Sequence, residues 1–256
     1  MLRRGEVGGL GSVRCRVALV AALVLVAAGC DWTSYGYGGG NTHDNPTERA
    51  IGVENVPATG PVILAPNHFS QWDHFFSAVY LPRKVQFMAK SQLFKNPAIK
   101  YIFKHGGVFP VRRGHHDEEA FITANTVLEK GGSVVMYCEG GRSRTGKLSD
   151  KPKRGIGRIA LETGAPIVPV AIYGSQKARN WKRLQFPKVT VQFGEPMTVD
   201  PVEHPTREQQ QAVADDVFGR IRHLYADLER HGRKGMVQRV REQRRAERRA
   251  GRTATA

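Results

Sequence analysis

Residues 62 to 73 read Val-Ile-Leu-Ala-Pro-Asn-His-Phe-Ser-Gln-Trp-Asp, and they join a short aliphatic run to a histidine and an aspartate. The run 62–65 has Gly-Pro before it and Pro-Asn after it, which predicts a buried strand. His68 then lies at the carboxyl end of a strand, where open α/β sheets bind their ligands. This stretch therefore predicts an α/β fold with functional side chains at one edge of the sheet.

His68 and Asp73 are five residues apart, a spacing that excludes contact on one continuous helix because the two side chains would be about 140° apart around its axis. We therefore expect His68 to precede a helix that Asp73 helps to open. An aspartate that accepts one ring N–H leaves the other ring nitrogen free to take a proton from an alcohol. The alternative is a surface histidine near a helix-opening aspartate, because a chain with nine histidines contains such spacings by chance.

The rest of the chain alternates between strand-like and helical patterns. With 256 residues and 40% hydrophobic content it can bury one sizeable core. The alternation predicts a mixed, mostly parallel central sheet flanked by helices. Strand-like runs lie near 62–65, 84–88, 107–111, 133–137, 167–173 and 188–193, and helical stretches near 72–80, 97–104, 117–130, 154–163 and 206–230. In the last helix, one apolar stripe faces the core, formed by Val213, Val217, Ile221, Leu224 and Leu228.

Three later segments accompany the His68 block. They read Gly-Gly-Val-Phe-Pro-Val-Arg-Arg at 106–113, Tyr-Cys-Glu-Gly-Gly-Arg-Ser at 137–143 and Ala-Pro-Ile-Val-Pro-Val at 165–170. In this order the four blocks resemble the glycerolipid acyltransferase family, whose best-known members are the 1-acylglycerol-3-phosphate (lysophosphatidic acid) acyltransferases. The resemblance extends over roughly residues 48 to 200, and it implies a glycerol-3-phosphate acyltransferase-like fold.

The resemblance also implies roles for particular residues. His68 is expected to be the general base and Asp73 its orienting partner. Arg112, Glu139 and Gly140 are expected to bind the phosphate end of the acceptor, because arginine forms paired charge-assisted bonds with phosphate and glycine lets backbone N–H groups approach it. The bland alternatives are a solvated edge for the arginine and a flexible turn for the glycine segment.

The third block departs from the usual pattern Phe-Pro-Glu-Gly-Thr-Arg-Ser. Tyr137, Cys138 and Gly141 stand where that pattern has Phe, Pro and Thr, whereas Arg142 is kept as a further substrate-binding candidate. Loss of the threonine hydroxyl leaves the identity of the acceptor open. Lys90 is a lesser phosphate candidate, with an ordinary surface lysine as the alternative.

Several other groups have the chemistry of metal ligands or nucleophiles. The segment 115–118, His-His-Asp-Glu, is better explained as the polar start of a helix, where acidic residues favour the positive amino end. His74 near His68 has no accompanying ligand motif, so we predict no metal site. Cys138 is either a thiolate nucleophile or, more commonly at a strand end, a buried structural residue.

The resemblance implies transfer of an acyl group from acyl-CoA or acyl-carrier protein to the hydroxyl of lysophosphatidic acid, forming phosphatidic acid without a metal or redox cofactor. One alternative is another lysophospholipid or a glycolipid acceptor. Another is a non-catalytic protein that binds membrane lipids.

The ends of the chain suggest contact with a membrane surface. Residues 231–256 hold nine Lys or Arg and two Glu, a net +7 of the chain's +16, and we interpret them as a basic helix or a disordered tail. Anionic lipid suits this tail better than nucleic acid, for which it has no recognition motif. We therefore expect no nucleic-acid partner. The alternative is a solvated charge run.

The first 45 residues combine a basic start, an apolar run at 17–28 and Cys30, followed by a Gly-rich linker. They resemble a signal peptide or a lipoprotein signal, and the run is short for a transmembrane helix. A shallow anchor or an over-extended start fits better with thioester donors, so we expect the enzyme on the cytoplasmic face of the cell membrane. The expected division is 1–45 leader and linker, 46–230 acyltransferase domain and 231–256 basic tail.

Overall fold

The structure is a computed structural model that describes residues 50–112, 118–143, 145–177 and 188–254. The leader with Cys30 lies outside these residues, as do Arg113 and the polar segment 115–117.

Seven strands form one sheet in the order β1-β7-β6-β2-β5-β3-β4. The five strands from β6 to β4 are mutually parallel, β7 runs antiparallel to β6, and β1 is parallel to β7. The bounds are β1 (Ala50–Ile51), β2 (Val62–Pro66), β3 (Gln86–Lys90), β4 (Val108–Val111), β5 (Ser133–Val135), β6 (Ile167–Tyr173) and β7 (Thr190–Phe193). The predicted mixed, mostly parallel sheet is confirmed.

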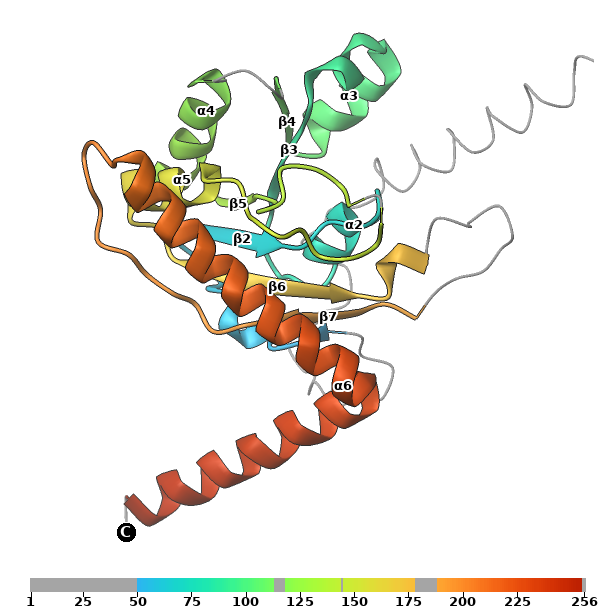
Figure 1. Cartoon of the computed structure of the whole chain (residues 1–256), viewed down its shortest axis with the longest axis vertical. Coiled ribbons are helices and arrows are strands. Elements are labelled where there is room, and N and C mark those ends of the chain that lie inside the picture. The colour runs from blue at the N-terminus through green and yellow to red at the C-terminus, as the bar shows by residue number, and fades with distance from the viewer. Residues whose placement is uncertain (1–49, 113–117, 144, 178–187, 255–256) are drawn as a thin grey trace, which may run out of the picture.

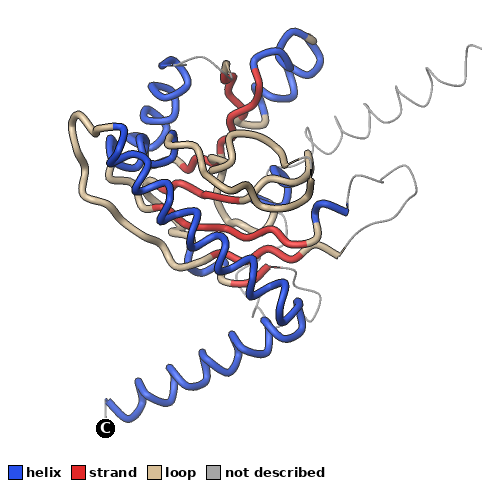
Figure 2. The backbone as a smooth tube through the Cα atoms, viewed as in Figure 1, coloured by secondary structure: helices blue, strands red, loops and turns tan. Residues whose placement is uncertain are grey.

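Helices cover both faces of this sheet (Figures 1 and 2). Their bounds are α2 (Asp73–Ala78), α3 (Pro97–His105), α4 (Glu118–Glu129), α5 (Gly155–Thr163) and α6 (Arg207–Ala254), with short 3-10 helices η1 (Val53–Asn55) and η2 (Ser91–Lys95). Each of the six strands and five helices expected from the sequence is present, and apart from the carboxyl end of α6 their ends are displaced by only a few residues. The two-residue β1 was not predicted, because it is too short to show a pattern.

The alternation of side chains along β2 divides the core into two layers. Ile63 and Ala65 pack with α4, α5 and α6 on one face, whereas Val62 and Leu64 pack with residues of the α2 region on the other. All five residues of β2 are buried, as expected for a central parallel strand covered on both faces. β2 therefore holds the residues that follow it at a rigid position in the middle of the sheet edge.

α6 extends further than the sequence predicted. It crosses the sheet over β6 and then continues, beyond a non-helical Gly232, as a second helical segment that projects from the body (Figure 1). Of the two interpretations of the basic tail, the helix is the one observed. Met236 is buried beside Tyr225 and Leu228, with Val237 and Val240 partly buried against the same cluster, so the start of this segment is packed on the domain.

Candidate functional site

Four of the parallel strands place the candidate residues at the same edge of the sheet. His68 follows β2, Glu139 follows β5, Lys90 ends β3 and Arg112 follows β4. Because the carboxyl ends of parallel strands meet at one edge, residues from four distant sequence blocks come to one side of the molecule.

His68 and Asp73 are in contact, as their spacing predicted. The His68 Nδ1 lies 3.0 Å from Asp73 Oδ2, and both side chains are buried. The same carboxylate oxygen accepts hydrogen bonds from the backbone N–H groups of Phe69 and Ser70, both at 2.6 Å. Three donors therefore converge on this oxygen at the start of α2. With Nδ1 donating to Asp73, Nε2 remains the nitrogen that can accept a proton.

The loop after β5 holds the peptide groups of His68. The His68 N–H donates to Glu139 Oε1 at 3.1 Å, and the His68 carbonyl accepts from the Ser143 N–H at 2.8 Å. Between them, Gly140 adopts a left-handed conformation (φ 66°), and a Cβ there would come within 2.9 Å of the Lys153 side chain. The third sequence block therefore positions the histidine of the first.

Asn67, the residue before His68, anchors this segment to β6. Its side-chain amide donates to the Ile172 carbonyl and accepts from the Ile172 N–H, at 3.1 and 2.7 Å. The buried amide thus replaces a strand ladder where β2 has ended, and it ties the His68 segment to β6. The sequence offered no signal for this role beyond the position of an asparagine next to His68.

Glu139 has an unusual ionisation. Burial raises its pKa to about 7, although hydrogen bonds from the backbone of His68 and Ser149 act in the opposite direction. The nearby Asp73 charge adds to the increase. Glu139 therefore changes its charge near neutral pH, directly beside the backbone of His68.

A cavity of about 430 Å³ opens beside Glu139. It brings together three of the predicted substrate-binding residues, Glu139, Gly140 and Arg142, with polar groups of the loop that follows. Its lining comprises Glu139, Gly140, Gly141, Arg142, Ser143, Thr145, Lys147, Leu148, Ser149 and Asp150. Its charged groups are two cations, Arg142 and Lys147, and two carboxyl groups, Glu139 and Asp150, and with several hydroxyl groups they make this cavity suited to a polar ligand.

Arg112 and Lys90 lie on the neighbouring strands and do not line that cavity. Lys90 is exposed and pairs in register with Val111, the residue before Arg112. Arg112 is 65% exposed and lies 3.2 Å from Glu119 Oε2. Both remain at the correct sheet edge, but the structure does not bring them together with Arg142.

Two aromatic neighbours of His68 were not predicted as site residues. The Tyr137 ring stacks on the His68 ring, with centroids 3.9 Å apart and planes 23° apart. The Tyr137 hydroxyl lies 3.0 Å from Nδ1 of His74, and the His74 ring meets His68 edge-on at 5.3 Å. The signal available in the sequence was the departure Phe→Tyr in the third block.

Cys138 is explained best as a structural residue rather than as a nucleophile. Cys138 is buried. Burial and then the nearby Glu139 charge raise the pKa of its thiol, which favours the structural interpretation.

Among the residues that the structure describes, no three His, Cys, Asp or Glu side chains gather as a metal site would require. In the same part of the chain no helix is both long and apolar enough to cross a bilayer.

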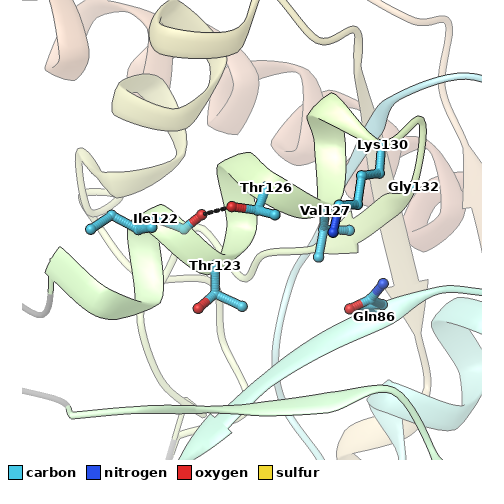
Figure 3. Close-up of a pocket in the computed structure, with 7 residues that line it drawn as sticks. All are labelled: Gln86, Ile122, Thr123, Thr126, Val127, Lys130 and Gly132. Carbon is cyan, nitrogen blue, oxygen red and sulfur yellow. Dashed lines mark hydrogen bonds between the residues drawn. The ribbon is translucent and has the colours of Figure 1, made fainter.

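A second cavity, also of about 430 Å³, lies at the opposite edge of the sheet (Figure 3). Ile122, Thr123 and Val127 line it from α4, with Gln86 from the start of β3 and Gly132 just before β5. Because it lies at the amino ends of the strands, it is separated from His68 by the depth of the sheet.

Comparison with known proteins identifies relatives over much of the domain. Residues 49–173 match the family model described as Acyltransferase. A 1-acyl-sn-glycerol-3-phosphate acyltransferase of Bacillus subtilis is 29% identical over 71% of this chain and 89% of its own length. A chloroplastic 1-acyl-sn-glycerol-3-phosphate acyltransferase of Brassica napus is 31% identical over 49% of this chain, which spans only 37% of that protein.

The fold also has a solved counterpart. The crystal structure of the 1-acyl-sn-glycerophosphate acyltransferase of Thermotoga maritima matches 70% of this chain and 71% of its own, with a TM-score of 0.55 at 23% identity. This likeness shows the fold, and the match of residues 49–173 to the Acyltransferase family model shows that just under half of the chain is similar to that family.

Proposed function

We propose that this protein transfers a fatty acyl group from acyl-CoA or acyl-carrier protein to the free hydroxyl of lysophosphatidic acid, forming phosphatidic acid in phospholipid biosynthesis. The observation that carries the proposal is the buried contact of His68 with Asp73 at 3.0 Å, at the carboxyl end of β2. Relatives named as 1-acyl-sn-glycerol-3-phosphate acyltransferases support the choice of acceptor.

The proposed reaction is a direct displacement. Nε2 of His68 takes the proton of the acceptor hydroxyl, and the oxygen attacks the thioester carbonyl carbon. The C–S bond then breaks, and the thiolate takes the proton from His68, so the histidine returns to its neutral state. Asp73 holds the tautomer and stabilises the transient imidazolium. These steps need no metal or redox cofactor.

The phosphate of the acceptor would bind in the cavity beside Glu139, with Arg142 as the arginine ligand. Arg112 and Lys90 are proposed to contribute from the adjoining strand ends. Arg112→Ala should raise the KM for lysophosphatidic acid more than the KM for the acyl donor, because the positive charge of Arg112 is proposed to attract the anionic acceptor from the neighbouring strand end. Equal effects on the two substrates would make Arg112 a structural residue instead.

A membrane surface is proposed as the third partner, on the cytoplasmic face where thioester donors occur. Trp72 and Phe75, next to Asp73, are 49% and 43% exposed, and Leu93 and Tyr101 follow β3 with 45% and 63% exposure. Exposed aromatic side chains beside lysines are typical of the interface between water and lipid. Protease treatment of intact cells tests this location, and digestion of the domain from outside would contradict it.

The decisive test of function is incubation of the purified full chain with labelled acyl-CoA or acyl-carrier protein and a panel of lysolipids. The expected product is labelled phosphatidic acid. Faster transfer to a lysophospholipid with a head group, or to a glycolipid precursor, would keep the reaction and change the acceptor. Lipid binding without turnover for any donor would instead support a non-catalytic lipid-binding protein.

A further inference from the structure

We propose that Tyr137 and His74 form a positioning pair that sets the orientation and the basicity of His68. The proposal rests on the acyl transfer proposed above, and it deepens it by naming two residues that act through the base. It starts from three rings, those of His68, Tyr137 and His74, that contact one another at the carboxyl edge of the sheet.

The Tyr137 ring fixes the plane of the His68 ring. The two rings are stacked with centroids 3.9 Å apart and planes at 23°, while Asp73 Oδ2 lies 3.0 Å from Nδ1. A stack on one side and a hydrogen bond at the edge leave the ring little freedom to rotate. The face of a phenol ring also attracts a cation placed over it. Stacking therefore favours the imidazolium that forms when His68 takes a proton.

The Tyr137 hydroxyl acts on His74 and not on His68. Burial, and then the Asp73 charge, raise the pKa of Tyr137 well above its ordinary value, so the phenol keeps its proton at neutral pH. A phenol that donates to His74 Nδ1, 3.0 Å away, requires that nitrogen to be unprotonated. Such a hydrogen bond favours neutral His74 over its cation.

A neutral His74 matters because its ring centroid is only 5.3 Å from that of His68. A positive His74 at this distance would oppose protonation of His68. The groups that face His74 are Tyr137 from the end of β5, His68 from the loop after β2, the Phe87 ring from β3 and the neighbouring Asp73 of α2. Of these, the Tyr137 hydroxyl is the group that bonds Nδ1, so its removal should make His74 easier to protonate.

Tyr137 is one of the departures of this chain from the usual pattern of the third block. The family pattern has phenylalanine at the position of Tyr137, which could stack on His68 but could not bond to His74. Tyr137→Phe therefore tests the hydroxyl while keeping the stack. His74→Asn is the matched variant, because its side-chain oxygen can accept from the phenol but cannot take up a charge.

The experiment uses the full chain with acyl-CoA and lysophosphatidic acid, and compares the wild type, each single variant and the double variant. Because a charged His74 opposes proton uptake by His68, the active form has both imidazoles neutral, and an easier protonation of His74 in Tyr137→Phe should move the acid limb of the kcat/KM profile to higher pH. The acceptor KM on the alkaline plateau should be unchanged. A shift of one pH unit corresponds to about a tenfold loss below the limb. Adding His74→Asn to Tyr137→Phe should restore the wild-type limb, which a merely structural role for Tyr137 would not predict.

NMR titration of labelled histidines provides a readout that does not depend on turnover. The pKa of His74 should rise in Tyr137→Phe. A fall would show that His74 donates to the phenol, and an unmoved pKa would show no coupling; either result overturns the proposal, as does an acid limb that stays in place. If no thioester gives turnover, the proposed function fails while the titration still decides whether the pair exists.

Discussion

Both polar groups of the His68 peptide are bonded to the loop after β5, so the position of the histidine depends on residues 71 and more positions away in the chain. Glu139 and Ser143 hold the backbone, Asp73 holds Nδ1, and Tyr137 covers one face of the ring. Glu139 thus acts on the base through the backbone N–H of His68 and not through its ring. This role differs from the sequence-based expectation that it contacts the acceptor, and the two roles can coexist because Glu139 also lines the cavity.

His68→Ala should lower turnover by about a hundred- to ten-thousandfold, the usual contribution of a general base. Asp73→Asn should also lower turnover strongly, because an amide can hold the wrong histidine tautomer. Steady-state kinetics with matched thermal denaturation checks both variants. Near-normal turnover of a folded His68→Ala protein would show that another group takes the proton.

Glu139→Gln should change how stability depends on pH. In the unfolded chain this carboxyl ionises near 4.5, and in the folded protein near 7. Between these values the unfolded state holds fewer protons, so this group makes the folded state less stable as pH rises through that range. The variant keeps an oxygen for the His68 N–H but cannot ionise.

The Tm of Glu139→Gln relative to that of the wild type should therefore rise from about pH 4.5 to about pH 7 and then level off. Thermal melts across this range measure it. A constant difference would mean that Glu139 ionises at its ordinary pH, and loss of activity on the acceptor side at constant stability would support direct contact with substrate.

Among the elements, α5 and α6 make one of the closest contacts in the protein. Gly157 of α5 is buried against the backbone carbonyl of Gln210 in α6, and a Cβ at Gly157 would collide with that oxygen. The adjoining side chains Val217 and Ile221 of α6 complete the same core layer. The missing side chain lets α6 approach closely enough to cover β2 and β6.

Gly157→Ala should therefore destabilise the domain by about 1–3 kcal/mol, the usual cost of overpacking a core. Gly219→Ala is the matched control, because it lies in α6 with no heavy atom within 4 Å of its Cβ. It should stabilise by about 0.5–1 kcal/mol through helix propensity. Urea denaturation of both variants measures the contrast, and equal effects would mean that α5 can shift away from α6.

At the scale of the whole molecule, the second segment of α6 lies in the basic tail, residues 231–256, which holds +7 of the chain's net +16. The segment projects from the domain (Figure 1), and Arg239, Arg241 and Arg245 are exposed, whereas Met236, Val237 and Val240 pack against the cluster around Tyr225. The turn between the two segments depends on Gly232, whose φ of 60° favours glycine. The charge is therefore presented by a helix that is fastened to the domain at its base.

Replacing Arg239, Arg241 and Arg245 with glutamine should weaken binding to anionic vesicles while keeping the packing of Met236. Binding of the unchanged protein should also fall as salt rises, since exposed charges are screened beyond about 10 Å at 0.1 M. Vesicle co-sedimentation at several salt concentrations measures both effects. Deleting residues 233–256 is a less specific test, because it also removes the packed apolar residues.

Equal binding of the variant and wild type would assign membrane contact to another surface, and the exposed Trp72 and Phe75 are the first candidates. Binding of the wild type to neutral vesicles at high salt would also assign membrane contact to another surface. Either outcome would leave the basic helix as a solvated charged segment.

The sequence by itself determined the elements of this fold, because apolar runs between Gly-Pro turns and a stripe of period 3.6 depend only on residue order. It also predicted the His68–Asp73 contact, since the two residues lie within one short loop and the start of a helix. It did not predict the end of α6, because the basic tail has few apolar residues to show a periodic pattern.

Only the tertiary structure decided how the distant blocks meet. Tyr137 stacks on His68, Asn67 bonds to Ile172, and Arg112 stays away from the cavity that holds Arg142. Such contacts depend on strand order and on the path of the loop after β5, which local patterns do not encode. A sequence motif therefore identifies which groups can react, whereas the packing of the parallel strands determines which of them touch.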